Sequence, residues 1–149
     1  MSIISDVSHK PLTRNPYQQG IKNATEGKKF LEENKQKSGV VTTESGLQYK
    51  IINKGSGLKP KNSDQVEVHY RGRLLNGQEF DSSYQKGKPA KFKLDQVISG
   101  WTEGLQLMSK GGKFEFYIPA DLAYGKTGTT GKIGSNATLI FEVELLDIN

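Results

Sequence analysis

The chain is 149 residues long, and 34% of its residues are hydrophobic while 25% are charged. This length holds one domain with a short appendage, and the composition supports a folded core, so global disorder is excluded. The absence of cysteine excludes disulfides, cysteine-ligated zinc and a thiol nucleophile, and because the 21 basic and 16 acidic side chains are interspersed, the net charge of +5 does not indicate a nucleic-acid partner.

Residues 1–15 are polar and aperiodic, and we expect them to be flexible. They lack both the basic stretch and the apolar stretch of a secretory signal. The chain as given is therefore expected in the cytoplasm, with the periplasm or the cell surface as the alternative if a longer precursor exists. No window approaches the roughly 18 consecutive apolar residues of a membrane span, so no membrane partner is expected.

A helix is predicted to begin at Asn15-Pro16, because asparagine caps free amides and proline suits the first helical position. Lysine, glutamate and glutamine continue at helical spacing to about residue 37, and Gly39 suits the end of the helix. We expect residues 16–44 to form an exposed helical arm and linker that cannot bury much of itself. Its thin apolar row consists of Ile21, Ala24 and Leu31.

From residue 45 onwards the pattern changes to a period of two, which is typical of half-buried strands. Residues 47–51, 66–71, 113–118 and 139–145 alternate between apolar and polar side chains, and residues 90–94 could form a fifth strand. Turns that contain glycine separate these segments, among them Asn76-Gly77. The sequence therefore predicts a mostly antiparallel sheet within one domain over residues 45–149.

One segment of this region has helical spacing instead. Val97, Trp101, Leu105 and Met108 recur at intervals of three or four residues, although Gly100 and Gly104 weaken the helix. We expect a short helix that lies against the sheet. The predicted fold class is α+β, with one face of a curved antiparallel sheet covered by a single helix.

The sequence offers no machinery for nucleotide, metal or hydrolytic chemistry. Gly125-Lys126-Thr127 matches the end of a phosphate-binding loop, but Ala120 stands where that motif needs its first glycine. His9 and His69 are far apart and lack companions at metal-ligand spacing, and neither has the setting of a Ser-His-Asp triad. We predict no cofactor and no metal.

Aromatic and aliphatic side chains suited to a pocket are spread over several predicted elements, and ordinary core packing would explain them if they stood alone. Four segments change this interpretation, because their order and spacing resemble those of the FKBP family of peptidyl-prolyl cis/trans isomerases. The resemblance extends over about residues 45–149. Residues 26–51 also resemble the helix-to-domain junction of the bacterial macrophage infectivity potentiator proteins. The four segments are VHYRGRLLNGQEFDSS (Val68 to Ser83), VISGWTEGLQLM (Val97 to Met108), IPADLAYG (Ile118 to Gly125) and ATLIFEVELL (Ala137 to Leu146).

The resemblance implies a twisted antiparallel sheet wrapped around one short helix, with an apolar cavity between them. Trp101 would form the floor of this cavity, Asp81 would lie at its rim, and Tyr124 would project from a flap. The implied catalytic residues are Tyr70, Asp81, Ile98, Tyr124 and Phe141, and Asp81 either steers the rotating carbonyl or anchors Tyr70. The implied substrate- and inhibitor-binding residues are Tyr70, Phe80, Asp81, Phe92, Val97, Ile98, Trp101, Tyr124, Ile133 and Phe141.

The implied function is rotation about X-Pro peptide bonds during protein folding, with proline-containing peptides and unfolded protein clients as partners. The alternative is a module or chaperone that binds proline-containing segments and isomerises them only incidentally. The resemblance also implies that the macrolides tacrolimus and rapamycin bind in the pocket. Because about fifteen residues precede the predicted helix, whereas related bacterial proteins dimerise through a domain ahead of it, we expect a monomer.

The sequence departs from the common family pattern at two positions. Ala90 stands where many members carry a wall aromatic, and Thr129 stands at the flap tip where many carry a histidine. A roomier and more polar pocket edge is expected, with weaker binding of the macrolides.

Overall fold

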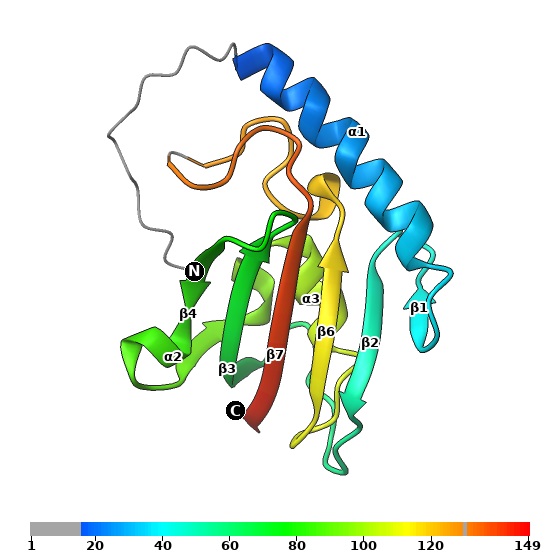
Figure 1. The fold of residues 1–149 in the computed structure, drawn as a ribbon. Coiled ribbons are helices and arrows are strands. Elements are labelled where there is room, and N and C mark those ends of the chain that lie inside the picture. The colour runs from blue at the N-terminus through cyan, green and yellow to red at the C-terminus, as the bar shows by residue number, and fades with distance from the viewer. Residues whose placement is uncertain (1–15, 130) are drawn as a thin grey trace.

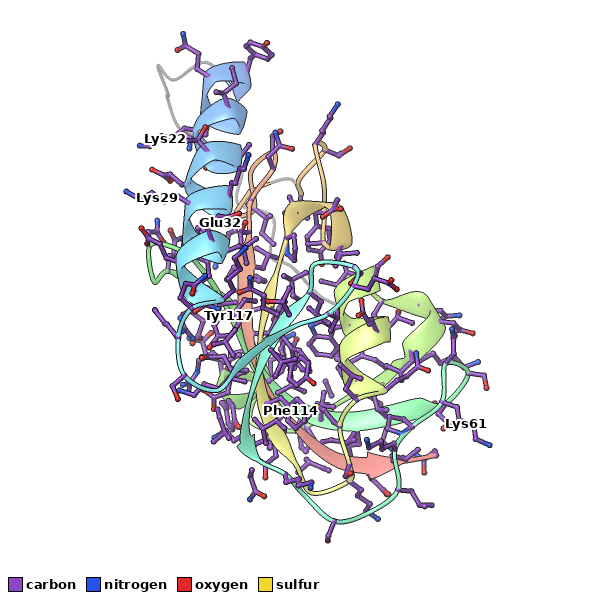
Figure 2. All side chains as sticks on the ribbon, turned by 90° about the vertical axis from the view of Figure 1, so that its right-hand side faces the viewer. Lys22, Lys29, Glu32, Lys61, Phe114 and Tyr117 are labelled. Atoms are coloured by element: carbon purple, nitrogen blue, oxygen red, sulfur yellow. The ribbon has the colours of Figure 1, made fainter. Side chains whose placement is uncertain are left out.

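The structure is a computed structural model that describes residues 16–129 and 131–149. An antiparallel sheet is covered on one side by helix α3 (Ser99–Leu105), while helix α1 (Pro16–Asn34) lies along its other side, as Figure 1 and Figure 2 show. The predicted α+β class is thereby confirmed. The strands are β1 (Val40–Thr42), β2 (Gln48–Asn53), β3 (Gln65–Leu74), β4 (Glu79–Ser82), β5 (Ala90–Lys93), β6 (Lys113–Ile118) and β7 (Leu139–Ile148), and the short helical turns are α2 (Ser83–Lys86), η1 (Leu94–Gln96) and η2 (Ala120–Leu122).

Strand β3 organises the sheet. Strand β7 pairs along nearly all of β3, from Val66 opposite Ile148 to Leu74 opposite Leu139. The other edge of β3 is shared, because β5 pairs with its first half and β4 with its second half. Beyond β7 the order continues through β6 and β2 to β1. Strands β4 and β5, which carry predicted pocket residues, therefore pair with β3 on either side of Tyr70 along the strand.

The five predicted strands are present, and the sequence pattern missed two more among the described residues. Strand β1 has only three residues and lies inside the expected linker, where it pairs with β2. Strand β4 has buried side chains at three successive positions, Phe80, Asp81 and Ser82, so no alternation marks it. The sheet thus begins before residue 45, at Val40.

The hydrophobic core lies between the sheet and α3, which is shorter than the predicted helix over residues 97–108. Helix α3 buries Trp101 and Leu105 against the sheet. A Cβ atom on Gly100 would come within 2.6 Å of the Ile118 side chain, and one on Gly104 within 2.6 Å of the Phe116 ring. The two glycines that weaken the helix are thus the ones that let its backbone lie close to the sheet.

Helix α1 ends at Asn34, somewhat before the predicted end near residue 37. It is exposed as expected: the Ile21 side chain is 52% exposed, and Lys22 and Lys29 point away from the sheet in Figure 2. The helix also has an inward face that hydropathy does not reveal, because Gly20, Gly27 and Asn34 are buried at seven-residue intervals. The predicted Asn15 cap and the segment expected to be flexible lie outside the described residues.

Candidate functional site

Trp101 is the centre of an aromatic cluster that draws on four elements. The rings of Tyr70 from β3, Phe92 from β5 and Phe141 from β7 each lie 5.3 Å from the Trp101 ring and nearly perpendicular to it. Aromatic pairs in this edge-to-face geometry stabilise the fold in addition to the free energy that comes from burying their area. The Trp101 Nε1 atom is buried and has no hydrogen-bond partner among the described residues. Trp101 is only 1% exposed, so the surrounding rings enclose its indole.

Gly72 is a residue of this cluster that the sequence analysis missed. It is buried on β3 directly opposite Phe141, and a Cβ atom there would lie 2.6 Å from the Phe141 ring and 2.7 Å from the Phe80 ring. Those two rings pack edge to face with centroids 5.5 Å apart. Its signal in the sequence was a glycine inside an otherwise regular strand pattern, which often marks a close approach.

A hydrogen bond joins the predicted rim residue Asp81 to the cluster. The Tyr70 hydroxyl donates to Asp81 Oδ2 at 2.9 Å, while Asp81 Oδ1 accepts from the Ser82 amide at 3.0 Å and lies 3.2 Å from Lys86 Nζ. Burial, and then the hydrogen bond to Asp81 and its negative charge, raise the pKa of Tyr70 well above its ordinary value. The Tyr70 hydroxyl is therefore held neutral and fixed in orientation.

Tyr124 brings a second hydroxyl to the same region from the loop that follows η2. Its ring is partly buried against the core. Burial, followed by the charge of Asp81, raises the pKa of Tyr124 to about 12. The phenol thus remains a neutral hydrogen-bond donor through the physiological range of pH.

The other predicted site residues pack on the same core. Ile133 is 1% exposed within the core cluster, and Val97, Ile98 and Phe92 are partly buried against it. Ile98 precedes α3 with an extended backbone, and its carbonyl accepts from the Trp101 amide at 2.9 Å. All ten residues that the resemblance assigned to the pocket therefore lie in or against one core.

The two departures from the family pattern lie at different places. Ala90 opens β5 opposite Val68, and because strand side chains alternate, it faces the same side as Phe92. Thr129 donates its amide to the Ile133 carbonyl at 2.8 Å, and its hydroxyl is buried without a hydrogen-bond partner among the described residues. A more polar pocket edge stays a prediction.

A separate groove of about 560 Å³ lies between α1 and the loops around Ser45 and Pro119. Its lining includes none of the aromatic cluster. In the described part of the chain no cluster of histidine, aspartate and glutamate could hold a metal ion, and no helix is long and apolar enough to cross a bilayer.

Two family models match the chain. Residues 57–146 match the model described as FKBP-type peptidyl-prolyl cis-trans isomerase, and residues 3–51 match the model of the domain amino-terminal to it. Together these matches include all ten predicted site residues, the whole of helix α1 and the linker.

Individual proteins agree with the family models. The chain is 53% identical to the FKBP-type peptidyl-prolyl cis-trans isomerase FkpA of Aeromonas hydrophila over 86% of this chain and 47% of that protein. It is 52% identical to the outer membrane protein MIP of Legionella longbeachae over 85% of this chain and 54% of that protein. The crystal structure of FkpA from Escherichia coli superposes with a TM-score of 0.87 and 46% identity, over 90% of this chain and 62% of that one. The chain spans about half the length of the curated relatives it matches.

Proposed function

This chain belongs to the FKBP-type peptidyl-prolyl cis-trans isomerase family, and we propose that it catalyses rotation about X-Pro peptide bonds in the cluster around Trp101. The observation that carries the proposal is the arrangement of that cluster. Three rings stand edge-on around a buried indole, and two neutral tyrosine hydroxyls lie beside it. The cluster is a buried apolar environment, and the Tyr124 hydroxyl is a neutral donor beside it.

Such a site suits the chemistry of the reaction. Resonance gives the peptide C–N bond partial double-bond character and opposes its rotation by about 18–20 kcal/mol, so uncatalysed exchange at proline takes on the order of tens of seconds. A twisted bond loses this resonance, and its transition state is less polarised than the planar ground state. An apolar site that excludes water therefore favours the twisted form over the planar one, which is differential binding of the transition state. No nucleophile is required.

The residues take the following roles in the proposal. The proline ring rests against Trp101 between Tyr70 and Phe141, while the Tyr124 hydroxyl and the Ile98 amide hold substrate carbonyls. Asp81 anchors Tyr70, because the Tyr70 hydroxyl already occupies one of its oxygens and the Ser82 amide and Lys86 the other. Substrates are proline-containing peptides and unfolded protein clients, with bulky residues such as leucine or phenylalanine favoured before proline.

The test is an exchange assay on Leu-Pro and Phe-Pro peptides, with the cis and trans forms followed by NMR so that no coupled protease is needed. The parent should shorten the exchange time, and Tyr124→Phe should lower kcat/KM about two- to tenfold, because it deletes one donor worth about 0.5–1.5 kcal/mol. Tyr49→Phe is the matched control: it also deletes one phenol hydroxyl, but its ring stacks on Phe114 and lies outside the cluster.

Equal exchange with and without stoichiometric protein would contradict the enzymatic proposal. If the peptides still bound under those conditions, as shown by shifts of the Trp101 fluorescence, the alternative of a proline-segment binding module would replace it. We also propose that tacrolimus and rapamycin compete with the peptides, since they would occupy the same aromatic walls.

A further inference from the structure

Helix α1 lies so close to the loop that carries Tyr124 that glycine occupies two of its contact positions, Gly20 and Gly27. We call this loop the flap loop; its described parts are residues 124–129 and 131–138. A Cβ atom on Gly27 would overlap the Thr138 hydroxyl, and one on Gly20 would lie 2.9 Å from Ser135 Oγ. The helix therefore touches the end of the flap loop with its backbone.

Hydrogen bonds link the same surfaces. Asn23 Nδ2 donates to the Ser135 carbonyl at 2.8 Å, and Asn136 Nδ2 donates to the Gly20 carbonyl at 3.3 Å. Gln19 donates to Asn23 Oδ1 at 2.9 Å, which orients the Asn23 amide for its bond to the loop. Two successive residues of the flap loop are thus tied to one turn of α1.

The tied residues are next to the base of the flap loop. Asn136 has a φ of 60°, the only positive φ of a non-glycine residue in the described part of the chain. The backbone amide of Asn136 donates to the carbonyl of Gly125, the residue after Tyr124, at 2.9 Å. The Tyr124 carbonyl in turn accepts from the Gly128 backbone amide at 3.1 Å. A shift at Asn136 would therefore be passed on to the backbone that presents the Tyr124 hydroxyl.

The other half of α1 is fixed to the sheet. Asn34 Nδ2 donates to Gln48 Oε1 at 2.8 Å, Gln48 Nε2 donates to the Leu31 carbonyl at 2.9 Å, and the Phe30 ring lies 6.0 Å from the Tyr117 ring. About 21 Å of helix separates Gly20 from Asn34. The helix thus forms a rigid bridge from β2 and β6 to the flap loop, along the path that Figure 1 shows.

We propose that α1 positions the isomerase site, with Asn23 and Gly27 as positioning residues that act through the flap loop and Tyr124. This proposal rests on the proposed function, because Tyr124 is its proposed carbonyl donor. The sequence analysis predicts α1 to be an exposed arm, whereas in this proposal α1 supports the loop that forms one wall of the site.

The first test does not depend on activity. Asn23→Asp keeps the size of the side chain and the acceptor for Gln19, but it removes the donor to Ser135. Hydrogen exchange at the amides of Gly125, Gly128 and Asn136 should become about three- to tenfold faster. The Gly111 amide, which bonds to the Leu145 carbonyl at 2.8 Å, reports on the rest of the fold and should not change.

The second test measures the reaction. Asn23→Asp and Gly27→Ala should each lower kcat/KM for a Leu-Pro peptide about three- to tenfold, although alanine favours a helix more than glycine does. In the Tyr124→Phe background the same changes should have little further effect. Lys29→Ala is the control on the outward face of α1 and should match the parent.

The outcomes separate the two proposals. Unchanged exchange at the three loop amides in Asn23→Asp would overturn the positioning role whether or not the parent is active. Equal losses of kcat/KM with and without the Tyr124 hydroxyl would also overturn it. A parent that accelerates no peptide, together with faster exchange of the loop amides, would overturn the proposed function and leave the link between α1 and the flap loop standing.

Discussion

Asp81 has three partners within the protein: the Tyr70 hydroxyl, the Ser82 amide and the Lys86 ammonium. Its side chain is only 3% exposed, whereas that of Lys86 is 42% exposed. A carboxylate in this position needs its hydrogen bonds, because an unpaired buried charge is costly. The arrangement favours anchoring of Tyr70 over direct action on a substrate carbonyl.

We expect Asp81→Asn to lower kcat/KM about tenfold, since a hydrogen bond to a charged acceptor is worth about 1.5–3 kcal/mol and its loss frees the Tyr70 ring to move. If anchoring is the role of Asp81, the same change should cost little in a Tyr70→Phe background. A double-mutant cycle of kcat/KM measures this coupling. Fully additive losses would instead assign Asp81 a direct role in the reaction.

Ala90 leads to a prediction about inhibitor binding. It lies on the same face of β5 as Phe92, whose ring contacts Trp101 at 5.3 Å. Ala90→Phe should add a wall that recovers part of the about 1.5–3 kcal/mol available from burying a ring, and so tighten tacrolimus by about 1 kcal/mol, or about fivefold. Peptide turnover should change less, because a proline ring does not reach this wall. Titration by Trp101 fluorescence measures the effect, and unchanged or weaker binding would show that residue 90 does not face the ligand.

At the scale of elements, α3 shows how a site can depend on the absence of side chains. Gly104→Ala should lower the free energy of unfolding by about 1–3 kcal/mol, because the new Cβ atom would lie 2.6 Å from the Phe116 ring and overpack the core. This loss must outweigh a gain in helix propensity of about 1 kcal/mol. Ser99→Ala, at an exposed position of the same helix, is the control. Urea unfolding of both variants decides the matter, and a more stable Gly104→Ala protein would mean that α3 can move away from the sheet.

The alternation of buried and less buried side chains determined which strands could be predicted from the sequence. Strands β6 and β7 alternate over residues 113–116 and 141–145 and were predicted, whereas the four-residue β4 buries Phe80, Asp81 and Ser82 in succession and has no alternation. The exposed helix α1 was predicted from its composition and its proline. Its inward face was not, because it consists of glycines and an asparagine amide that hydropathy does not detect.

The candidate site divides in a similar way. A set of aromatic residues is visible in the sequence, but only the resemblance joined residues as distant as Tyr70 and Phe141 into one pocket. The structure brings them together because β3 and β7 are neighbours with Gly72 opposite Phe141. Gly72 itself was missed, since its role is to leave space for two rings.

At the scale of the whole molecule, three tyrosine hydroxyls have raised pKa values, and two of them, Tyr70 and Tyr124, belong to the candidate site. Burial is the first cause that raises the pKa of Tyr70, Tyr117 and Tyr124, and a neighbouring carboxylate contributes in each case. Tyr117 lies away from the cluster, on β6, and donates to Glu115 at 2.6 Å. Lys113 forms an ion pair with Glu142 at 2.8 Å, which raises the pKa of its ammonium.

These shifts predict that the protein loses stability in alkali. A folded-state pKa above the unfolded value, about 10 for tyrosine, means that the folded chain holds its protons more tightly. The stabilising contribution is therefore complete below about pH 10 and is lost as the pH rises through the folded values, which for Tyr124 is about 12. The raised pKa of Lys113 acts in the same direction. Urea unfolding at a series of pH values, with tyrosinate absorbance followed in parallel, should show a fall that begins near pH 10. Tyr117→Phe should make the free energy of unfolding fall less steeply with pH without changing peptide turnover, because it removes one titrating group outside the site. A constant free energy of unfolding of the parent up to about pH 11 would contradict the burial of these hydroxyls.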